Sequence, residues 1–187
     1  ISTQPYKGAR DFYPEDKAFQ KWMFDKWRTV VEKYGFLEMD APILEPTDLY
    51  LIKGNQEIID EQTYTFKDRG ERSVTIRAEM TPSVSRMVAG RRQELAYPLR
   101  WYSIPNLWRY ERMQRGRLRE FWQLNIEMFG VSNEMAEIEM IMIVDDLFQV
   151  FKAKRSSYTI KINSRLLVNE MLAGLELSSE STTNVIR

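Results

Sequence analysis

The sequence predicts an α+β fold in which an antiparallel β-sheet is flanked by helices. Strand-like segments follow one another in the middle of the chain, and helical patterns lie before and after them rather than alternating strictly with single strands. The chain has 187 residues, of which 43% are hydrophobic and 12% aromatic, enough to bury one sizeable core. We therefore expect a single domain over residues 1–187.

The first half of the chain predicts a helix, a strand and a hairpin. Apolar residues recur at steps of three and four over residues 17–34, with Pro14 at the entry and Gly35 just after the end, which indicates an amphipathic helix. A strand over residues 36–39 should run into an extended corner at Pro42, whose ring restricts the backbone. The next expected elements are hairpin strands at 62–67 and 73–76 and a helix at 82–91 capped by Thr81.

The second half predicts more strands and two further helices. Ser132 or Asn133 can cap a helix over residues 134–151, and Ser164 can cap a last helix that ends at Gly174. The expected strands are residues 99–104, 107–112, 118–129 and 158–163, with a loop around residues 114–116.

Composition excludes several classes of chemistry. Lysine plus arginine number 27, as do aspartate plus glutamate, so no overall field favours nucleic acid or membrane partners. The absence of cysteine excludes disulfides, the absence of histidine removes the commonest general base, and no metal-ligand spacing or phosphate-cradling glycine loop occurs. Without an apolar run long enough to span a bilayer, a cytoplasmic protein without a metal site is expected.

The predicted long strand places polar side chains in a row. Alternation puts Gln123, Asn125 and Glu127 on one face between the rings of Phe121 and Phe129. On a covered sheet these groups need partners, and an amine or imidazole ligand would supply them. On a face open to solvent they need none, and the strand alone favours neither interpretation.

An arginine-rich turn precedes this strand. Arg109 and Glu111 lie two residues apart, hence on one face, and an arginine held on a strand can present its donors to a phosphate. Phe121 could offer a flat surface for a base. A solvated charged hairpin and a loop for nucleic-acid contact are the alternatives. The arginines that crowd the turn are Arg112, Arg115, Arg117 and Arg119.

A carboxylate and a hydroxyl lie where the second hairpin strand gives way to a helix. Arg77, Glu79 and Thr81 follow the strand directly. A second anion there, facing Gln123 and Glu127, would bind a cationic amine. Helix capping by Thr81, with Glu79 beside it at the positive end of the helix, explains the same residues equally well.

These residues also resemble a known family. Residues 108–112 (Trp-Arg-Tyr-Glu-Arg), followed by residues 115–121 (Arg-Gly-Arg-Leu-Arg-Glu-Phe), resemble motif 2 of class II aminoacyl-tRNA synthetases, specifically the histidyl branch. Motif 2 would span about residues 100–130, and about residues 17–44 resemble motif 1. Further matching segments, which extend the resemblance over nearly the whole chain, are residues 8–12, 64–68, 77–82, 123–130 and 163–165.

The resemblance implies a class II synthetase-like sheet and the ATP-dependent activation of histidine to histidyl-adenylate. Arg109 is the implied catalytic residue, at the α-phosphate of ATP. Glu111 would hold the adenine, Phe121 would stack on it, and Arg117 would position the phosphate tail. The implied substrate-binding residues are Glu79, Thr81 and Gln123, around the amino group, and Glu127, which faces the imidazole.

The resemblance also implies partners and missing parts. Mg²⁺ would accompany ATP, tRNA would bind mainly through regions outside this chain, and the region of motif 1 would form a homodimer. Because the chain ends before motif 3, the last strands and an anticodon-binding domain, we expect a partial catalytic domain that is inactive by itself. The alternative is a non-catalytic synthetase-like regulatory subunit of the kind that partners ATP phosphoribosyltransferase.

Three residues depart from the pattern of the family. Met113 and Ala78 occupy positions where proline is common, so both turns should be looser. Asn125 stands where many bacterial members have glycine and some archaeal-like members have asparagine. These departures concern the pose of the substrate rather than the class of activity.

Overall fold

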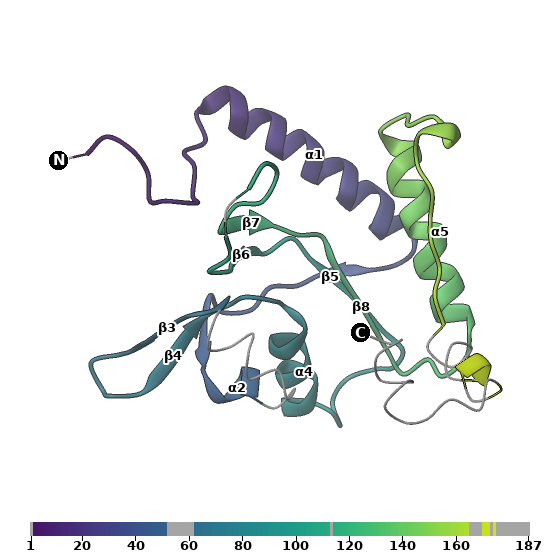
Figure 1. Cartoon of the computed structure of the whole chain (residues 1–187). Coiled ribbons are helices and arrows are strands. Elements are labelled where there is room, and N and C mark those ends of the chain that lie inside the picture. The colour runs from purple at the N-terminus through teal and green to yellow at the C-terminus, as the bar shows by residue number, and fades with distance from the viewer. Residues whose placement is uncertain (1, 52–61, 113, 165–169, 173, 175–187) are drawn as a thin grey trace. The chain divides into compact units, whose positions relative to one another are not determined.

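The computed structural model of the chain describes residues 2–51, 62–112, 114–164, 170–172 and 174 (Figure 1). The chain divides into two compact units, Ile1–Lys152 and Ala153–Arg187, which we describe separately. Within the described residues, no helix is both long and apolar enough to cross a membrane. All elements of the functional site belong to the first unit.

The first helix, α1, spans Pro14–Lys33 and confirms the predicted amphipathic helix. It begins three residues earlier than predicted because Pro14 itself takes the first helical position, where a missing N–H costs no hydrogen bond. Glu15 and Asp16 in the first turn and Lys33 in the last complement the helix dipole. Gly35, at a φ of 75°, turns the chain into the following strand.

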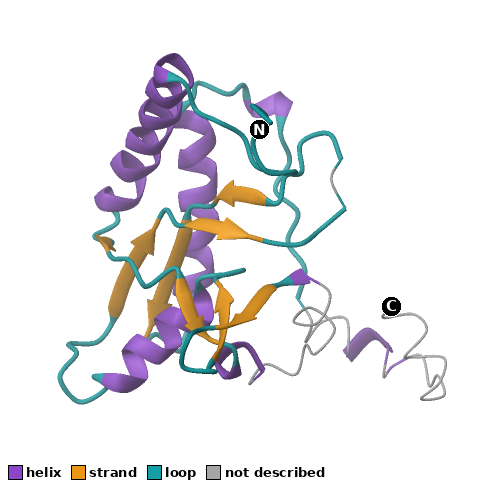
Figure 2. Cartoon of the chain, turned by 90° about the vertical axis from the view of Figure 1, so that its left-hand side faces the viewer, coloured by secondary structure: helices purple, strands orange, loops and turns teal. Residues whose placement is uncertain are grey.

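The central sheet has the strand order β1-β5-β8 and is covered on both faces. Its strands are β1 (Leu37–Glu38), β5 (Leu99–Ser103) and β8 (Asn125–Phe129). β1 runs parallel to β5, and β8 runs antiparallel to it, with Leu99 opposite Phe129. Helices α1 and α5 (Met135–Val150) lie on one face of this sheet and α4 (Thr81–Gly90) on the other, and Figure 2 shows helices on both sides of the strands. Tyr102 and Ile126 belong to the apolar cluster with α1 and α5, while Trp101 and Phe129 belong to the cluster with α4.

A second sheet has the order β2-β4-β3, all antiparallel. β3 (Tyr64–Lys67) and β4 (Ser73–Ile76) confirm the predicted hairpin. Strand β2 (Leu44–Pro46) and the four-residue helix α2 (Asp48–Leu51) were not predicted. Their sequences carry too short a pattern, and Pro46 argues against a strand except at the edge of a sheet, where β2 lies.

The predicted long strand at residues 118–129 is wrong, because the chain changes partner within it. Strand β7 (Glu120–Trp122) pairs with β6 (Asn106–Trp108), whereas β8 pairs with β5. Gln123 lies in the two-residue break between β7 and β8. The strand predicted at 107–112 likewise ends at Trp108, since the backbone N–H of Tyr110 donates to Gln62 instead of continuing the ladder.

Two helices complete the first unit. α4 spans Thr81–Gly90, so Thr81 is its first residue and Met80 its N-cap, which corrects the predicted capping role of Thr81. α5 spans Met135–Val150 and confirms the predicted helix to within a residue at each end. The N-cap of α5 is Glu134, which corrects the prediction of Ser132 or Asn133; Asn133, one residue earlier, still accepts a hydrogen bond from the backbone N–H of Met135 at 3.2 Å.

The second unit contains a short 3₁₀ helix, Arg155–Ser157. The strand predicted at residues 158–163 is wrong: these residues form no strand, because no described segment pairs with them. The predicted helix from Ser164 to Gly174 lies largely outside the described residues. Of its residues, 170–172 and 174 are described, and they are helical.

Candidate ATP and amino acid site

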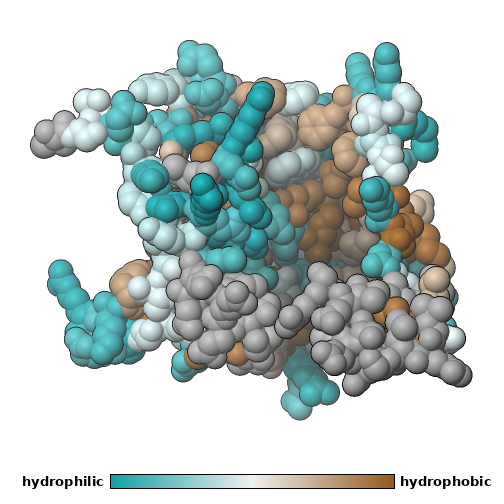
Figure 3. All heavy atoms as spheres, viewed as in Figure 1, coloured by the Kyte–Doolittle hydropathy of each residue, from teal (hydrophilic) through white to brown (hydrophobic). Residues whose placement is uncertain are grey.

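The arginine-rich segment forms a hairpin beyond β6 and β7, as predicted. The N–H of Arg109 donates to the carbonyl of Arg119 at 2.9 Å, which extends the pairing past the end of β6. A tight turn follows, in which the N–H of Arg117 donates to the carbonyl of Gln114 at 2.9 Å and Gly116 has a φ of 79°. Hydrophilic side chains cover this part of the molecule (Figure 3).

Arg109 is anchored on two sides. Its Nε donates a hydrogen bond to the carbonyl of Ala78 at 2.9 Å, and its guanidinium carbon lies 5.3 Å from the centre of the Phe121 ring. These contacts join the hairpin to the segment before α4 and use one of the five N–H donors of the guanidinium. An arginine held in this way can present its other donors to an anion without first losing side-chain entropy.

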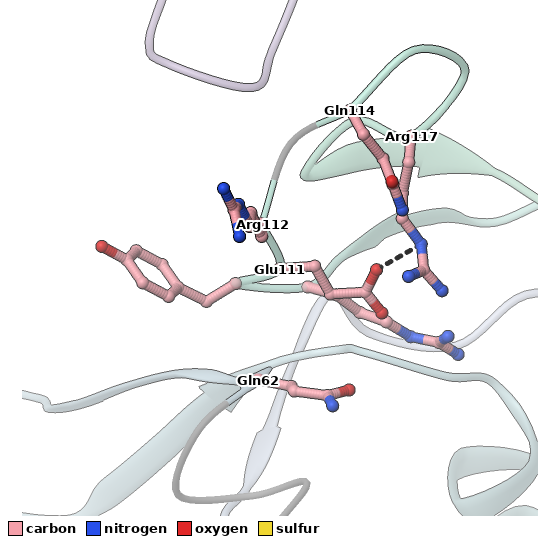
Figure 4. A pocket seen from close by; sticks show the side chains of 7 residues that line it. Gln62, Glu111, Arg112, Gln114 and Arg117 are labelled. Atoms are coloured by element: carbon pink, nitrogen blue, oxygen red, sulfur yellow. Dashed lines mark ion pairs between the residues drawn. The ribbon is translucent and has the colours of Figure 1, made fainter.

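A cavity of about 770 Å³ opens beside Arg109 (Figure 4). A smaller hollow of about 320 Å³ shares Arg109, Glu111 and Arg117 and adds Phe121 to the lining. Both volumes are in the range of small-ligand sites, and the walls are rich in hydrogen-bond donors. The residues around the larger cavity are Gln62, Arg109, Tyr110, Glu111, Arg112, Gln114 and Arg117.

Glu111 and Arg117 form an ion pair within this cavity. The Nε of Arg117 lies 2.6 Å from Oε2 of Glu111, as Figure 4 shows. The Glu111 side chain is only 14% exposed, whereas that of Arg117 is 57% exposed. The structure therefore brings together the four residues predicted to bind ATP, with Glu111 and Arg117 bound to each other.

A second polar cluster centres on Glu127 in β8. The hydroxyl of Thr81 donates to Oε1 of Glu127 at 2.7 Å, and the side-chain amide of Asn125 donates to the same oxygen at 3.1 Å. Sequence patterns left the role of Thr81 open between capping and ligand binding. The structure uses its hydroxyl to hold a carboxylate, so α4 has no side-chain cap.

The other two predicted substrate residues are placed differently. Glu79 is half-buried between β4 and α4, near Tyr50. The pKa of the Tyr50 hydroxyl is raised to about 12, mainly because the hydroxyl is buried and to a smaller extent because the carboxylates of Glu45 and Glu79 are close. Gln123 is exposed, and its backbone N–H donates to the carbonyl of Pro105. Because the strand breaks there, Gln123 does not share a continuous strand face with Glu127, which corrects that prediction.

Three contacts that support the site could not be read from the sequence. Arg77 is 3% exposed and has a structural role, binding Asp40 at 2.7 Å and backbone carbonyls. Asn125 holds Glu127. The carbonyl of Gly8 accepts hydrogen bonds from the N–H groups of Arg119 and Glu120, at 2.9 and 3.1 Å. No local pattern could reveal these contacts, since their partners are distant in the sequence or, for Asn125, depend on which strand face is covered.

The sequence profile described as histidyl-tRNA synthetase matches residues 8–187 of this chain. The chain belongs to the histidyl-tRNA synthetase family. It is 47% identical over 186 residues to the histidine–tRNA ligase of Leptospira biflexa, covering 99% of this chain and 43% of that protein. It is 44% identical over 182 residues to the histidine–tRNA ligase of Thermoplasma volcanium, covering 97% of this chain and 42% of that protein.

A solved histidyl-tRNA synthetase has the same fold. The crystal structure of the enzyme from a Nostoc species superimposes with a TM-score of 0.84 at 22% sequence identity, covering 99% of this chain and 42% of that one. The predicted synthetase-like α+β fold is thereby confirmed. The chain spans less than half the length of the curated relatives it matches, so the activity of the whole protein is a proposal.

Proposed function

We propose that the protein containing this chain is a histidine–tRNA ligase that activates histidine with ATP and transfers it to tRNA. The observation that carries the proposal is Arg109, fixed between the Phe121 ring and the carbonyl of Ala78 at the wall of a cavity that Glu111 and Arg117 also line. The membership of the chain in the histidyl-tRNA synthetase family supports the choice of amino acid.

On the ATP side, Arg109 donates to the α-phosphate. As the carboxylate of histidine attacks this phosphorus in line, pyrophosphate leaves, and the pre-oriented guanidinium stabilises the charge that develops on the phosphate oxygens. Phe121 offers its ring to the adenine, and Glu111 accepts a hydrogen bond from the base. Arg117 binds the outer phosphates, so ATP binding exchanges the 2.6 Å Glu111–Arg117 ion pair for contacts with the ligand.

On the amino acid side, Glu127 faces the imidazole, and Glu79, Thr81 and Gln123 surround the amino group. The contact between Thr81 and Glu127 supports a common pocket, because it brings the start of α4 against β8. The carboxylate of Glu79, half-buried at the same end of α4, suits the positive charge of an α-ammonium group.

We assign no residue to Mg²⁺. The described residues contain no group of three or more acidic, histidine or cysteine side chains that could hold a metal, and Glu111 is bound to Arg117. The ion expected with ATP would therefore arrive as part of that substrate. Magnesium in such sites is commonly held by phosphates and water, with only one or two carboxylates from the protein.

We further propose that the protein is a homodimer joined through the region of motif 1. Several large apolar side chains in this region are exposed, and β1 has a strand neighbour on one side only within the described sheet. An open edge strand beside exposed apolar residues is a surface that proteins usually cover. The exposed residues are Phe19 (64%), Trp22 (47%), Leu37 (68%), Ile43 (53%) and Leu44 (47%).

ATP–pyrophosphate exchange by the complete gene product, measured with each amino acid in turn, tests the activity. We expect exchange that depends on histidine. Exchange with no amino acid would contradict the proposal and favour a non-catalytic regulatory subunit. Aminoacylation of tRNA with labelled histidine then tests the transfer step. A cytoplasmic location stays a prediction.

A further inference from the structure

The carboxylate of Glu127 is held asymmetrically. Both hydrogen bonds that it accepts from described residues fall on Oε1, one from Thr81 at 2.7 Å and one from Asn125 at 3.1 Å. Neither falls on Oε2. Two donors on one oxygen restrict the rotation of the carboxylate about its last bond, so the direction in which Oε2 points is set by Thr81 and Asn125 together.

Asn125 makes this contact from a sheltered position. It is 9% exposed and lies directly opposite Ser103, which is 1% exposed and whose hydroxyl has no partner among the described residues. Water therefore competes weakly for the Asn125 amide, and a buried amide needs a partner to offset its desolvation. Glu127 is that partner, two residues along the same strand and on the same face.

The side chain of Asn125 is not needed to build the strand. Backbone pairing with β5 would be the same for another residue, and the apolar cluster under α1 and α5 includes Ile126 and Met128, which point to the opposite face of the sheet from Asn125. The amide thus contributes an interaction with Glu127 rather than packing of that cluster. Thr81 reaches the same oxygen from α4, which makes the pair a clamp built from two elements.

We propose that Asn125 is a positioning residue for the amino acid substrate, acting through Glu127. With Thr81 it holds Oε1, so that Oε2 is presented to an N–H donor of the substrate side chain. This inference rests on the proposed function, which places the histidine imidazole at Glu127. It assigns to Asn125 a role in selecting histidine, separate from the ATP site at Arg109.

The test compares variants of the complete protein in ATP–pyrophosphate exchange, with the KM for histidine and the KM for ATP measured separately. Asn125→Asp keeps the size of the side chain but replaces the N–H donor with a second carboxylate. This carboxylate would lie within hydrogen-bond distance of Glu127, where the amide nitrogen now lies 3.1 Å from Oε1. Two such carboxylates repel or share a proton. Asn125→Ala removes the amide without adding charge and without the extra backbone freedom of glycine, and it remains informative if the aspartate variant does not fold.

Asn106→Asp is the matched control. Asn106 also lies in a strand and donates its amide to a glutamate, Glu120, at 2.9 Å, but it belongs to β6, outside the Glu127 cluster. We expect the KM for histidine to rise about tenfold or more in both Asn125 variants, and more in Asn125→Asp, with the KM for ATP changed less than about twofold. Asn106→Asp should leave the KM for histidine near that of the wild type.

The outcomes separate the inference from the proposed function. A wild-type protein without histidine-dependent exchange overturns both. An active wild type in which the Asn125 variants keep the KM for histidine overturns the inference alone. So does a parallel rise of both KM values with a lowered melting temperature, since that pattern indicates a merely structural role for the amide.

Discussion

Two neighbours hold the side chain of Arg109 in position before any ligand binds. The ring of Phe121 and the carbonyl of Ala78 hold its guanidinium from two directions. Neither contact neutralises the positive charge, so the arginine remains available to an anion. The hairpin, the segment before α4 and β7 all contribute to the position of this one group.

We predict that Arg109→Ala in the complete protein lowers the rate of histidine-dependent exchange by a factor of about 10² to 10³. One oriented donor at a centre that develops charge contributes roughly 3 to 4 kcal/mol to the stabilisation of the transition state. The fold should persist, since among the described residues the Arg109 side chain donates a hydrogen bond only to the carbonyl of Ala78. Steady-state exchange and circular dichroism measure the two effects.

The control is Arg72→Ala, which removes an arginine that is 81% exposed in the β3–β4 turn. It should exchange at the wild-type rate. A wild-type rate in Arg109→Ala would remove Arg109 from the mechanism. A similar loss in both variants would point to a general effect of removing positive charge.

Gly8 is required for a close approach. It has a φ of 91°, and a Cβ added there would lie 2.6 Å from Cγ of Arg119. The guanidinium of Arg119 stacks 3.9 Å from the ring centre of Tyr110, and the Arg119 carbonyl accepts the N–H of Arg109. The segment around Gly8 therefore supports the start of β7 and, through it, the position of Arg109.

We predict that Gly8→Ala destabilises the protein by about 1 to 3 kcal/mol more than Gly35→Ala. Gly35 also has a positive φ, 75°, but an added Cβ would have no atom within 4 Å, so the difference isolates the overlap with Arg119. The free energies of unfolding in urea measure it. Equal losses in the two variants would show that backbone strain alone matters at Gly8.

At the scale of elements, the first unit is joined by a few polar links between helices and sheet. Arg100 in β5 binds Glu139 in α5 through two hydrogen bonds, one of them 2.8 Å long, and donates to the carbonyl of Tyr34 after α1. Arg86 in α4 binds Glu45 in β2 at 2.7 Å. Each link connects elements that are distant in the sequence.

The Arg100–Glu139 link predicts a dependence of stability on pH. The hydrogen bond from Arg100 lowers the pKa of Glu139, although burial opposes it. A carboxyl whose pKa is lowered in the folded state stabilises the fold above its unfolded pKa, about 4.3, and this contribution is lost as pH falls through the folded pKa. The free energy of unfolding should therefore decrease as the pH is lowered below about 4.3.

Urea unfolding at pH 7 and at about pH 3 tests this prediction. Glu139→Gln should cost about 1 to 2 kcal/mol at pH 7 and less at the lower pH, because the stabilisation by the wild-type carboxylate declines as the pH falls toward its lowered pKa. Glu137→Gln, at an exposed position of the same helix, is the control and should cost less than about 0.5 kcal/mol at either pH. A Glu139→Gln cost that is equal at both pH values would exclude the proposed linkage.

Arg86 tests the link between β2 and α4. Glu45 is 3% exposed, so Arg86→Ala leaves a buried carboxylate without its cation and should destabilise the protein by about 3 kcal/mol. Arg91→Ala breaks a pair with Glu94 that is 3.8 Å long and exposed on both sides, and should cost less than about 0.5 kcal/mol. Thermal or urea unfolding compares them; similar costs would mean that burial of Glu45 does not matter.

At the scale of the whole molecule, the central sheet separates two apolar clusters. Val31, Phe36 and Ile143 lie in the cluster under α1 and α5, while Met80 and Val84 lie in the one under α4. Apolar side chains of α5 also remain exposed, and Figure 3 shows hydrophobic surface over this helix. Exposed apolar surface of this kind usually serves association.

We predict that Leu37→Lys weakens the proposed dimer. Leu37 is 68% exposed on the edge strand β1, and a lysine there would place a charge in an interface built on motif 1. Sedimentation velocity of the complete protein should show two chains for the wild type and a shift toward one for the variant. Phe66→Lys, at a 46% exposed position in β3, should remain dimeric. A monomeric wild type, or an unchanged Leu37→Lys dimer, would contradict the proposed interface.

Much of the molecule could be predicted from local patterns. The helices α1 and α5 have an apolar period of three to four residues, and the β3–β4 hairpin has strand formers on either side of a glycine turn, so their positions follow from short-range chemistry. The arginines and the carboxylate around Arg109 were also found in this way. Their proposed role in binding ATP rests on the resemblance to motif 2.

Only the tertiary structure decided which groups satisfy one another. The change of strand partner at Gln123 depends on β5 and β6. The hydroxyl of Thr81 donates to Glu127, 46 residues away, instead of capping its own helix. A polar group has several possible hydrogen-bond partners in sequence, and burial selects among them because an unpaired buried group costs more than a lost alternative. The sequence thus determined the main helices, the β3–β4 hairpin and the chemical groups, while packing decided where the chain changes strand partner and how Asn125, Thr81 and Glu127 meet.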